Sequence, residues 1–424
     1  MSNGRGRHRL VLGVKIVKPA GPRRMDDLAL RPHSPDDRKS IDYSDVCPDR
    51  LMTRVDVFLQ YYKPHVSGLT NMAAVLAEYA AVNGYDMHVH SVALAGGSTT
   101  SDMDGVTVHT YKRSFSLGRA AFSFALLRQM WRMRKRGGIA HVHMPYPESF
   151  IIAALFRRGW TFVSTYQCDA PMEGVTDSLI ARALDWSHRI LLKRSVVAVA
   201  SSSDYAGYTR LRDAIAANDL EIVPVTGIDR RGGTAKYRME GRRIIGFMGR
   251  PTYEKGINVL IEAMEKMPHD DVTLLFAGPV SGLTEKTGYD AQRLQALVDA
   301  GRVKFVGFLE EEEIKDFYAS MDVYVHPSIN SFDAFGIVQI EAMSAGIPVV
   351  ASDIPGVRTA VQATGFGEIT RAGDANDLLR GLLTALEKTY DAERARAVLD
   401  EVYLPPVPQA QYLRIYDKVT GKQR

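Results

Sequence analysis

The sequence predicts two consecutive α/β domains, each built on a doubly wound parallel sheet. Two observations indicate this fold class. Short apolar runs alternate with amphipathic helical segments along most of the 424 residues, and a Gly-, Arg- and Thr-rich stretch without periodicity, residues 225–243, interrupts the alternation near its middle. The composition, 46% hydrophobic and 24% charged, is that of a globular protein. A chain of this length is expected to form two or three domains.

The first series of segments defines a domain over residues 52–229. A strand at 55–59, a helix at 71–83 and a strand at 87–92 are typical of a parallel βαβ unit. The same pattern predicts strands at 139–143, 161–165 and 196–200, with helices at 149–156 and 176–195 between them.

The second series defines a domain over residues 236–405. We expect strands at 244–248, 272–277, 303–305, 323–325 and 348–351, with helices at 256–267, 289–300, 311–319, 335–345 and 374–390. A last helical segment, within 406–424, is expected to pack back on the first domain. Doubly wound sheets bind ligands beyond the carboxyl ends of their strands. The sequence therefore predicts a site in a central cleft between the two domains.

Residues 1–51 differ from the rest of the chain. They contain 11 Lys and Arg and 7 Asp, and only residues 10–17 have the pattern of a strand. This composition predicts a disordered extension, and a short edge strand followed by a linker is the alternative. The remaining residues carry 42 charges of each sign, which argues against broad contact with nucleic acid.

Cysteine content and hydropathy indicate the compartment. Cys47 and Cys168 are the only cysteines, too few for a disulfide framework, and this favours a reducing cytoplasm. No apolar run approaches the roughly 18 residues of a spanning helix. We therefore expect a cytoplasmic protein.

The turn from Gly249 to Gly256 follows a predicted strand and precedes a predicted helix. It contains Arg250 and Lys255. Glycines allow close approach of the backbone to a ligand, and a helix amino terminus attracts anions. Together with the two cations, this arrangement is suited to a diphosphate. The alternative is that both cations are ordinary surface charges beside a turn.

Two acids lie close together in the sequence of the second domain. Asp333 precedes a predicted helix, and Glu341 lies eight positions later on the same side of that helix, among apolar neighbours. A half-buried carboxylate needs hydrogen-bond donors, and the two hydroxyls of a ribose would supply them. The alternative is that Asp333 only caps the helix and that Glu341 is a satisfied helix acid.

The segment from Pro327 to Val350 resembles the signature of retaining nucleotide-sugar glycosyltransferases of the GT-B type, glycosyltransferase family 4. In that signature two acids separated by seven positions precede Glu-Ala-Met-x-x-Gly-x-Pro-Val-Val, here residues 341–350. The turn from Gly249 to Gly256 is similar to the phosphate-binding segment of that family. The resemblance extends from about residue 53 to about residue 416. It implies a GT-B fold of two Rossmann-like domains and a hexosyltransferase.

The resemblance also implies roles for individual residues. Arg250 and Lys255, with Gly249, would hold the donor diphosphate and stabilise the leaving charge, and Glu341 would bind the ribose. Asp333 would approach hydroxyls of the donor sugar, where the family usually has Glu, so the identity of the sugar stays open. The remaining donor-binding positions implied are Gly307, Phe308 and Leu309 at the base, and Ala334, Phe335 and Gly336 beside the sugar. Such enzymes typically need no metal or other cofactor.

The first domain contributes candidates for the acceptor side of the cleft. Gly68 lies in a loop that resembles the family's glycine-bearing loop, and it is our candidate for close approach to the donor or acceptor; an ordinary turn is the alternative. Gln167 occupies the position of a histidine in many relatives, and because an amide does not titrate it cannot act as a general base. Asp169 would orient the acceptor or stabilise a turn. His141 and His143 share a strand face, as a metal pair or, more simply, as core or cleft-edge histidines.

A basic segment runs from Lys112 to Arg136. No acid occurs between Asp104 and Glu148, and residues 117–136 have the pattern of an amphipathic helix that mixes Phe and Trp with Arg and Lys. Such a helix can lie on an anionic membrane at the inner face. The alternative is a domain helix with a solvated basic end. The membrane interpretation predicts a lipid-linked acceptor, and the alternative predicts a small molecule or a glycoside.

Three other functions share this fold. They are a sugar-nucleotide-binding protein without activity, a phosphorylase or epimerase, and a nicotinamide-dependent oxidoreductase. The last requires Gly-x-Gly-x-x-Gly after the first strand, and residues 61–70 lack it. The sequence therefore favours a glycosyltransferase that uses a nucleotide sugar.

Overall fold

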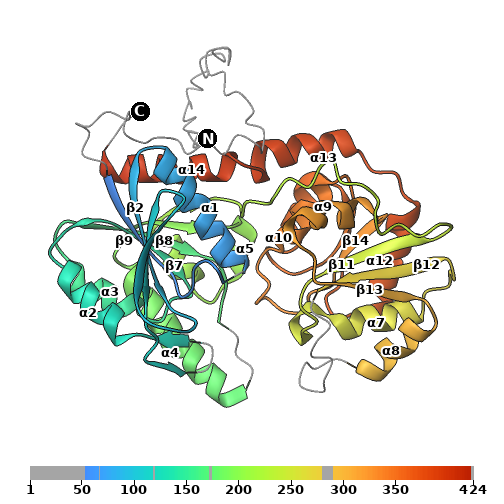
Figure 1. Ribbon diagram of the computed structural model, residues 1–424, viewed down its shortest axis with the longest axis horizontal. Helices are drawn as coiled ribbons and strands as arrows, with labels where there is room; N and C mark the ends of the chain where they lie inside the picture. The colour runs from blue at the N-terminus through green and yellow to red at the C-terminus, as the bar shows by residue number, and fades with distance from the viewer. Residues whose placement is uncertain (1–52, 66, 118–119, 171–173, 279–289, 422–424) are drawn as a thin grey trace, which may run out of the picture. The chain divides into compact units, whose positions relative to one another are not determined.

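The structure is a computed structural model that describes residues 53–421, except for residue 66 and residues 118–119, 171–173 and 279–289. The extension predicted for residues 1–51, with Cys47, lies outside the described residues. Two parallel sheets, each flanked by helices, organise the described chain (Figure 1). The predicted two-domain α/β architecture is confirmed.

The first sheet has the strand order β10-β9-β8-β7-β1-β2-β4-β3, in which only β3 runs antiparallel to its neighbour. Its strands are β1 (Thr53–Phe58), β2 (Tyr85–Val92), β3 (Thr99–Met103), β4 (Val106–Tyr111), β7 (Gly138–Met144), β8 (Trp160–Tyr166), β9 (Ser195–Ala200) and β10 (Asp219–Ile222). Its helices are α1 (Gly68–Val82), α2 (Phe124–Met133), α3 (Ser149–Leu155), α4 (Gly174–Leu192), α5 (Ser203–Tyr208) and α6 (Arg212–Ala216).

Alternation along the strands divides the core of this sheet into two layers. Val55 and Val57 of β1 pack in one cluster with α1, while Phe58 packs in another with α2, α3 and α4. Successive side chains of a strand point to opposite faces, so a sheet covered on both sides needs apolar residues at nearly every position. This requirement explains the continuous apolar runs in the sequence.

The second sheet has the order β13-β12-β11-β14-β15-β16 and is parallel throughout. Its strands are β11 (Arg243–Met248), β12 (Val272–Ala277), β13 (Val303–Gly307), β14 (Val323–His326), β15 (Val349–Ser352) and β16 (Gly367–Thr370). Its helices are η2 (Tyr253–Lys255), α7 (Ile257–Glu265), α8 (Ala291–Asp299), α9 (Glu311–Ala319), α10 (Ile337–Ser344), α11 (Thr359–Thr364), α12 (Ala375–Glu387), α13 (Ala392–Val398) and the π-helical turn η4 (Leu399–Tyr403).

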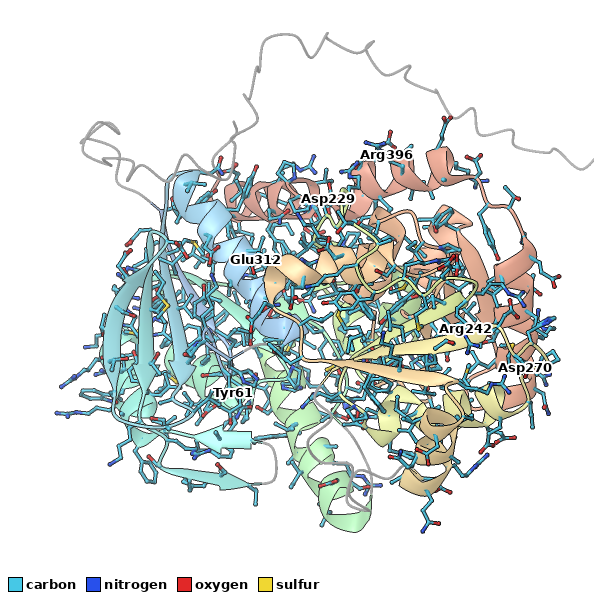
Figure 2. All side chains as sticks on the ribbon, turned by 45° about the vertical axis from the view of Figure 1, so that its right-hand side comes forward. Tyr61, Asp229, Arg242, Asp270, Glu312 and Arg396 are labelled. Carbon is cyan, nitrogen blue, oxygen red and sulfur yellow. The ribbon has the colours of Figure 1, made fainter. Side chains whose placement is uncertain are left out.

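Both sheets reverse their strand order at a point that positions loops for ligand binding. In the second sheet the reversal lies between β11 and β14, and in the first it lies between β1 and β7. Loops that leave such a switch point diverge to opposite faces and open a crevice at the carboxyl edge. Arg242 and Asp270, labelled in Figure 2, precede β11 and β12 and therefore mark the opposite, amino-terminal edge.

The C-terminal helix α14 (Val407–Thr420) contacts the first sheet (Figure 1). The hydroxyl of Tyr416 lies 2.6 Å from Nδ1 of His141 on β7, and the hydroxyl of Tyr412 lies 3.2 Å from that of Thr165 on β8. Lys418 forms ion pairs with Asp219 and Glu221 on the edge strand β10.

The predicted helix over residues 117–136 is wrong in its first part. A two-stranded hairpin, β5 (Phe115–Leu117) and β6 (Ala120–Phe122), precedes the shorter helix α2. The rings of Phe115 and Phe122 stack across the hairpin with centroids 4.9 Å apart. Ser123 then caps α2, because its hydroxyl accepts a hydrogen bond from the backbone N–H of Leu126. Among the helices of the described residues, none has the length and apolar content needed to cross a bilayer.

Candidate functional site

The loop after β11 is shaped by two glycines that no other residue could replace without strain. Gly256 has φ +68°, and a Cβ atom there would overlap the carbonyl oxygen of Pro327 in the loop after β14. Gly249 has φ +155°. Its carbonyl oxygen would lie 2.2 Å from a Cβ atom at Gly278, so the two backbone segments are in close contact. The backbone N–H of Ile329 donates to the carbonyl of Glu254 at 3.0 Å. The loops after β11 and β14 are therefore in direct backbone contact.

Asp333 is held at this junction by three donors that share one carboxylate oxygen. Oδ2 accepts hydrogen bonds from Nζ of Lys255 at 2.6 Å, from Nε2 of His326 at 2.7 Å and from the hydroxyl of Ser328 at 2.5 Å. The side chain of Asp333 is 9% exposed, and that of Lys255 is 30% exposed. The structure thus brings together two predicted catalytic residues, Lys255 and Asp333, as an ion pair.

The electrostatics keep the carboxylate of Asp333 ionised. Burial by itself raises its pKa, but Lys255 and His326 outweigh burial and hold the pKa well below its usual range. Asp333 does not cap helix α10, because the N-cap position is Gly336 and no side chain caps that helix. The alternative role as a simple N-cap is therefore wrong.

Arg250 stands apart from this cluster. Its side chain is exposed, and no described residue forms a hydrogen bond or an ion pair with it. Helix α7 begins directly after the loop, with Gly256 at its N-cap. Its first backbone N–H groups lack partners within the helix, as at every helix amino terminus. A guanidinium without a partner among the described residues, a partly exposed ammonium and a helix terminus therefore lie within one short segment.

Glu341 is buried on α10 and binds two other protein groups. Its carboxylate lies 3.4 Å from Nη2 and 3.4 Å from Nε of Arg230, and it accepts a hydrogen bond from the hydroxyl of Tyr318 at 3.2 Å. Burial raises the pKa of Glu341 despite these partners. Arg230 also binds Glu311 at 2.5 Å and follows Asp229, which is labelled in Figure 2. Asp333 and Glu341 therefore have separate partners.

The remaining donor-side positions form the rim and floor of the same edge. Gly307 ends β13 with φ +79°, and its carbonyl accepts from the N–H of Gly278 at 2.8 Å. Phe308 is 76% exposed, whereas Leu309 is buried. Ala334 and Phe335 are buried in the core, and Gly336 has φ +78° before α10.

On the side of the first sheet, Gly68 is the first residue of α1. The hydroxyl of Ser67 accepts from the N–H of Thr70 at 3.2 Å and caps the helix. A Cβ atom at Gly68 would lie 3.3 Å from Cδ1 of Ile337, so the start of α1 lies against the start of α10. Tyr61, labelled in Figure 2, lies just past the end of β1 in the loop before this helix.

His143 and Gln167 form a pair at the carboxyl ends of β7 and β8. The amide nitrogen of Gln167 lies 3.1 Å from Nδ1 of His143, while Nε2 of His143 is buried and has no hydrogen-bond partner among the described residues. Burial lowers the pKa of His143 to about 3, so it is neutral at physiological pH. Both ring nitrogens of the neighbouring His141 are occupied, by the hydroxyls of Tyr416 and Thr165. Among the described residues, no three His, Cys, Asp or Glu side chains are arranged to hold a metal ion.

Asp169 lies within a buried polar network. Its carboxylate accepts hydrogen bonds from the hydroxyls of Tyr166 and Thr209, the latter at 2.7 Å, and lies 3.8 Å from the guanidinium of Arg210. Its backbone N–H lies 2.7 Å from the hydroxyl of Tyr205. These contacts are those of a residue that stabilises the turn after β8.

Several residues at these edges were not recognised in the sequence. His326 at the end of β14, Ser328 in the loop that follows, and Arg230 beside Glu341 are three of them. Glu148 is a fourth: it lies past the end of β7, is 1% exposed, and neither carboxylate oxygen has a hydrogen-bond partner among the described residues. A polar residue at or just past the end of a buried strand at a switch point is the signal that could have identified His326 and Glu148.

Two surface cavities lie away from these residues. One, of about 300 Å³, is lined by β10 and α14, and the other, of about 240 Å³, lies beside α13 and η4. None of the predicted site residues lines either cavity.

Two family models match consecutive parts of the chain. Residues 67–226 match the glycosyl transferase 4-like domain, and residues 234–398 match the glycosyl transferases group 1 domain. The chain is 29% identical over 315 residues to phosphatidyl-myo-inositol mannosyltransferase of Mycobacterium leprae, which covers 72% of this chain and 80% of that protein. The enzyme of the same name from Mycolicibacterium smegmatis is 28% identical over 319 residues, with 72% and 78% covered.

Solved structures share the fold. Sucrose-phosphate synthase of Thermosynechococcus elongatus superposes with a TM-score of 0.69 over 88% of this chain and 100% of that chain, at 19% identity. HepE of Anabaena, solved in complex with UDP, superposes with a TM-score of 0.66 over 87% of this chain and 100% of its own, also at 19% identity. The two matching domain models, the relatives and the shared architecture lead to one conclusion: this chain is a glycosyltransferase of the GT-B type, resembling family 4.

Proposed function

We propose that the protein transfers a hexosyl unit from a nucleotide sugar to a hydroxyl acceptor, with retention of anomeric configuration and without a metal ion. The observation that carries this proposal is the group of Lys255, Arg250 and the amino terminus of α7 beside the ionised Asp333 at the switch point of the second sheet. Cations and helix termini stabilise phosphate oxygens, and a buried carboxylate recognises sugar hydroxyls.

The donor diphosphate would lie against the loop after β11. The ammonium of Lys255 has three protons and gives one to Asp333, so two remain for phosphate oxygens. Arg250 would bind the same oxygens, since its guanidinium has no protein partner among the described residues. Phe308, 76% exposed beside the glycine turn at the end of β13, would stack on the nucleobase.

Glu341 would bind the ribose. Its carboxylate already has Arg230 and Tyr318 as partners, so the ribose hydroxyls would share an acceptor that the protein holds in place. The relatives support the donor class: the mannosyltransferase of Mycobacterium leprae aligns with 72% of this chain, and HepE has been solved with UDP and with UDP-glucose.

In the reaction, the bond from the anomeric carbon to the phosphate oxygen breaks while the acceptor oxygen forms a bond on the same face of the sugar. The acceptor proton moves to the departing phosphate oxygen, which gains negative charge as it leaves. Gln167 cannot take this proton, and the low pKa of His143 makes it a weak base. Lys255, Arg250 and α7 would stabilise the leaving group, which is the electrostatic role that a metal ion has in other enzymes.

The proposal is tested with a panel of UDP-glucose, UDP-galactose, GDP-mannose and ADP-glucose. A donor present at about 100 times its dissociation constant should stabilise the protein by about 2.7 kcal/mol in a thermal-shift experiment. The donor that binds should be turned over in the presence of EDTA, and NMR of the product should show a retained anomeric configuration. Inversion, or loss of activity in EDTA that a divalent ion restores, would contradict the proposal.

A specific surface favours a membrane-bound acceptor. The basic aromatic surface, as we call it, combines the hairpin β5–β6 with α2. Phe115, Leu117, Phe124 and Trp131 are 49%, 54%, 66% and 56% exposed on it. Its exposed cations include Lys112, Arg113, Arg128, Arg132 and Lys135. We propose that it binds anionic lipid, where each cation near the surface is worth about 1 kcal/mol.

Arg136, the last cation of the predicted basic segment, binds a residue of the first sheet. Nη2 of Arg136 lies 2.5 Å from Oδ2 of the buried Asp56, so Arg136 stabilises the sheet. Arg134 stacks over the ring of Trp131, with 3.7 Å between the guanidinium carbon and the ring centroid. Such stacking keeps a tryptophan and a cation together at the surface, an arrangement suited to the interfacial region of a bilayer.

Co-sedimentation with vesicles tests whether the basic aromatic surface binds anionic lipid. Wild type should bind phosphatidylglycerol vesicles at low salt and lose binding at high salt, and it should not bind phosphatidylcholine vesicles. The variant R128E/R132E should lose most of the binding. The matched control K315E/R394E makes the same charge change at two exposed positions of the second domain and should bind like wild type. Equal loss in both variants would show a net-charge effect and remove this surface from the proposal.

A further inference from the structure

The carboxylate of Asp333 is partnered on one side only. Three donors converge on Oδ2, whereas Oδ1 accepts no hydrogen bond from any described residue. Two of those donors, His326 and Ser328, come from the end of β14 and the loop that follows it. We propose that His326 is a positioning residue of the donor site: it fixes the carboxylate of Asp333 through Oδ2 and so presents Oδ1 to a hydroxyl of the donor hexose. This inference rests on the proposed function.

The backbone of α10 makes room for the imidazole. Gly336 has φ +78°, and a Cβ atom there would lie 2.6 Å from Nε2 of His326. A residue with a side chain at position 336 would therefore push the imidazole away from Asp333. The positive φ and the close approach explain why glycine is needed at this point. His326 is itself 2% exposed, so its ring has little freedom to move.

The two ring nitrogens of His326 have different surroundings. Nε2 lies 2.7 Å from Oδ2 of Asp333, a carboxylate oxygen that accepts, so Nε2 donates this hydrogen bond. Nδ1 is buried and has no hydrogen-bond partner among the described residues. His326 therefore acts on Asp333 as a fixed hydrogen-bond donor, beside the ammonium of Lys255.

The separate roles of Lys255 and of the donors His326 and Ser328 become important when the nucleotide sugar binds. A diphosphate beside Lys255 competes with Asp333 for the ammonium protons. If the ammonium moves toward the phosphate, His326 and Ser328 still hold Oδ2, and the carboxylate keeps its orientation. His326 and Ser328 would thus let one site serve two neighbouring anionic groups, the phosphate and Asp333. A hexose hydroxyl on Oδ1 would complete the hydrogen bonding of the buried carboxylate.

The test compares His326→Leu, which removes the donor, with His326→Gln, whose amide N–H can replace it. The substrate is the nucleotide sugar of the panel that wild type turns over, and its nucleoside diphosphate is the sugar-free probe. A hydrogen bond to a charged group is worth about 1.5–3 kcal/mol, so H326L should lower kcat/KM by about 10- to 100-fold. H326Q should recover to within about fivefold of wild type. Affinity for the nucleoside diphosphate should stay within twofold in both variants.

The matched control is His269→Leu, which removes a histidine of the same domain outside the site and should leave kcat/KM unchanged. Nitrogen NMR of His326 in wild type should show a proton on Nε2. Wild-type kcat/KM in H326L, equal loss of sugar-free nucleotide affinity, or a ring without a proton on Nε2 would overturn the inference. Absence of turnover with every nucleotide sugar in wild type would instead overturn the proposed function, and the NMR result would still decide whether His326 donates through Nε2.

Discussion

Two buried carboxylates, one at the switch point of each sheet, differ in their hydrogen-bond partners and in the direction of their pKa shift. Asp333 in the second sheet has three donors on one oxygen, and its pKa lies well below the usual range. Glu148, in the loop after β7 of the first sheet, has no hydrogen-bond partner on either oxygen among the described residues, and burial raises its pKa to about 7. The neighbouring hydroxyl of Tyr146 is likewise buried with no partner in the part of the chain that the structure describes.

The difference shows that one fold can build two electrostatic environments at its sheet edges. The edge of the second sheet holds the charged groups Lys255, Arg250 and Asp333, which suit the nucleotide that we propose as donor. At the edge of the first sheet, burial favours the uncharged forms of Glu148 and His143, and it lowers the pKa of His143 to about 3. Asp169 at the same edge is instead paired with Arg210. The part of this edge around Glu148 and His143 suits the hydroxyl acceptor that we propose.

The largest expected effect concerns the cations of the second sheet. Lys255→Ala and Arg250→Ala should each lower kcat by about 10²–10³, because each removes a charge that stabilises the leaving phosphate. Only Lys255→Ala should also lower the free energy of unfolding, since Arg250 has no described protein partner. Steady-state kinetics and chemical denaturation of both variants measure this. Wild-type kcat in both would mean that the diphosphate binds elsewhere.

The second prediction tests the two carboxylates through pH. From its ordinary value of 4.5 the pKa of Glu148 rises to about 7 in the folded state. Between these values the folded protein holds a proton that the unfolded chain has lost, so this residue makes stability fall as pH rises. Glu148→Gln stays neutral. It should therefore gain about 3 kcal/mol over wild type between pH 4.5 and pH 8.

Asp333→Asn is the opposite case. The lowered pKa of Asp333 contributes stability above its ordinary value of 3.8, and this contribution is lost as pH falls through the folded pKa. Denaturation at pH 5 and pH 8 should show D333N less stable than wild type at both values, with no gain in stability at pH 8.

The same measurement can contradict the prediction for Glu148. A Glu148→Gln variant without a pH-dependent gain in stability would mean that Glu148 has a partner in solution.

The third prediction compares a glycine from each side of the site. Gly256→Ala should destabilise the protein by about 1–3 kcal/mol, because it places a side chain at positive φ against the backbone of Pro327. At Gly68, a Cβ atom would meet only the mobile end of Ile337 at 3.3 Å. Gly68→Ala should therefore leave the melting temperature nearly unchanged, and any loss of activity in it would report a ligand at the start of α1.

The smallest expected effect concerns Glu341. The ribose hydroxyls change little as the sugar bond breaks, so Glu341→Gln should raise the donor KM by about 10-fold and leave kcat within a few-fold. The variant keeps the shape of the side chain and weakens its bonds to Arg230 and to a diol. A large fall in kcat with unchanged KM would place Glu341 near the reacting atoms instead.

Periodicity and glycine placement were sufficient to predict most of the second domain. The helix over 311–319 and the strand over 272–277 have the same bounds in the structure as in the prediction. The region from Phe115 to Met133 was not predicted correctly, since a hairpin and a short helix share its apolar and basic composition. The cross-strand stacking of Phe115 on Phe122 decides the local structure there, and no periodicity reveals a pair of rings seven residues apart.

The sequence by itself determined the fold class, the approximate positions of most strands and helices, and the residue types of the loop from Gly249 to Gly256, because strand and helix periods and glycine positions are local properties. Only the tertiary structure decided which groups share a hydrogen bond. Lys255 and Asp333 are 78 positions apart and meet because β11 and β14 are neighbours in the sheet. Glu148 follows Pro147 in a proline-containing turn, yet folding leaves it 1% exposed with no hydrogen-bond partner among the described residues. Burial and pairing depend on what the rest of the chain places around a residue, and this is why the opposite electrostatics of the two edges emerged only from the structure.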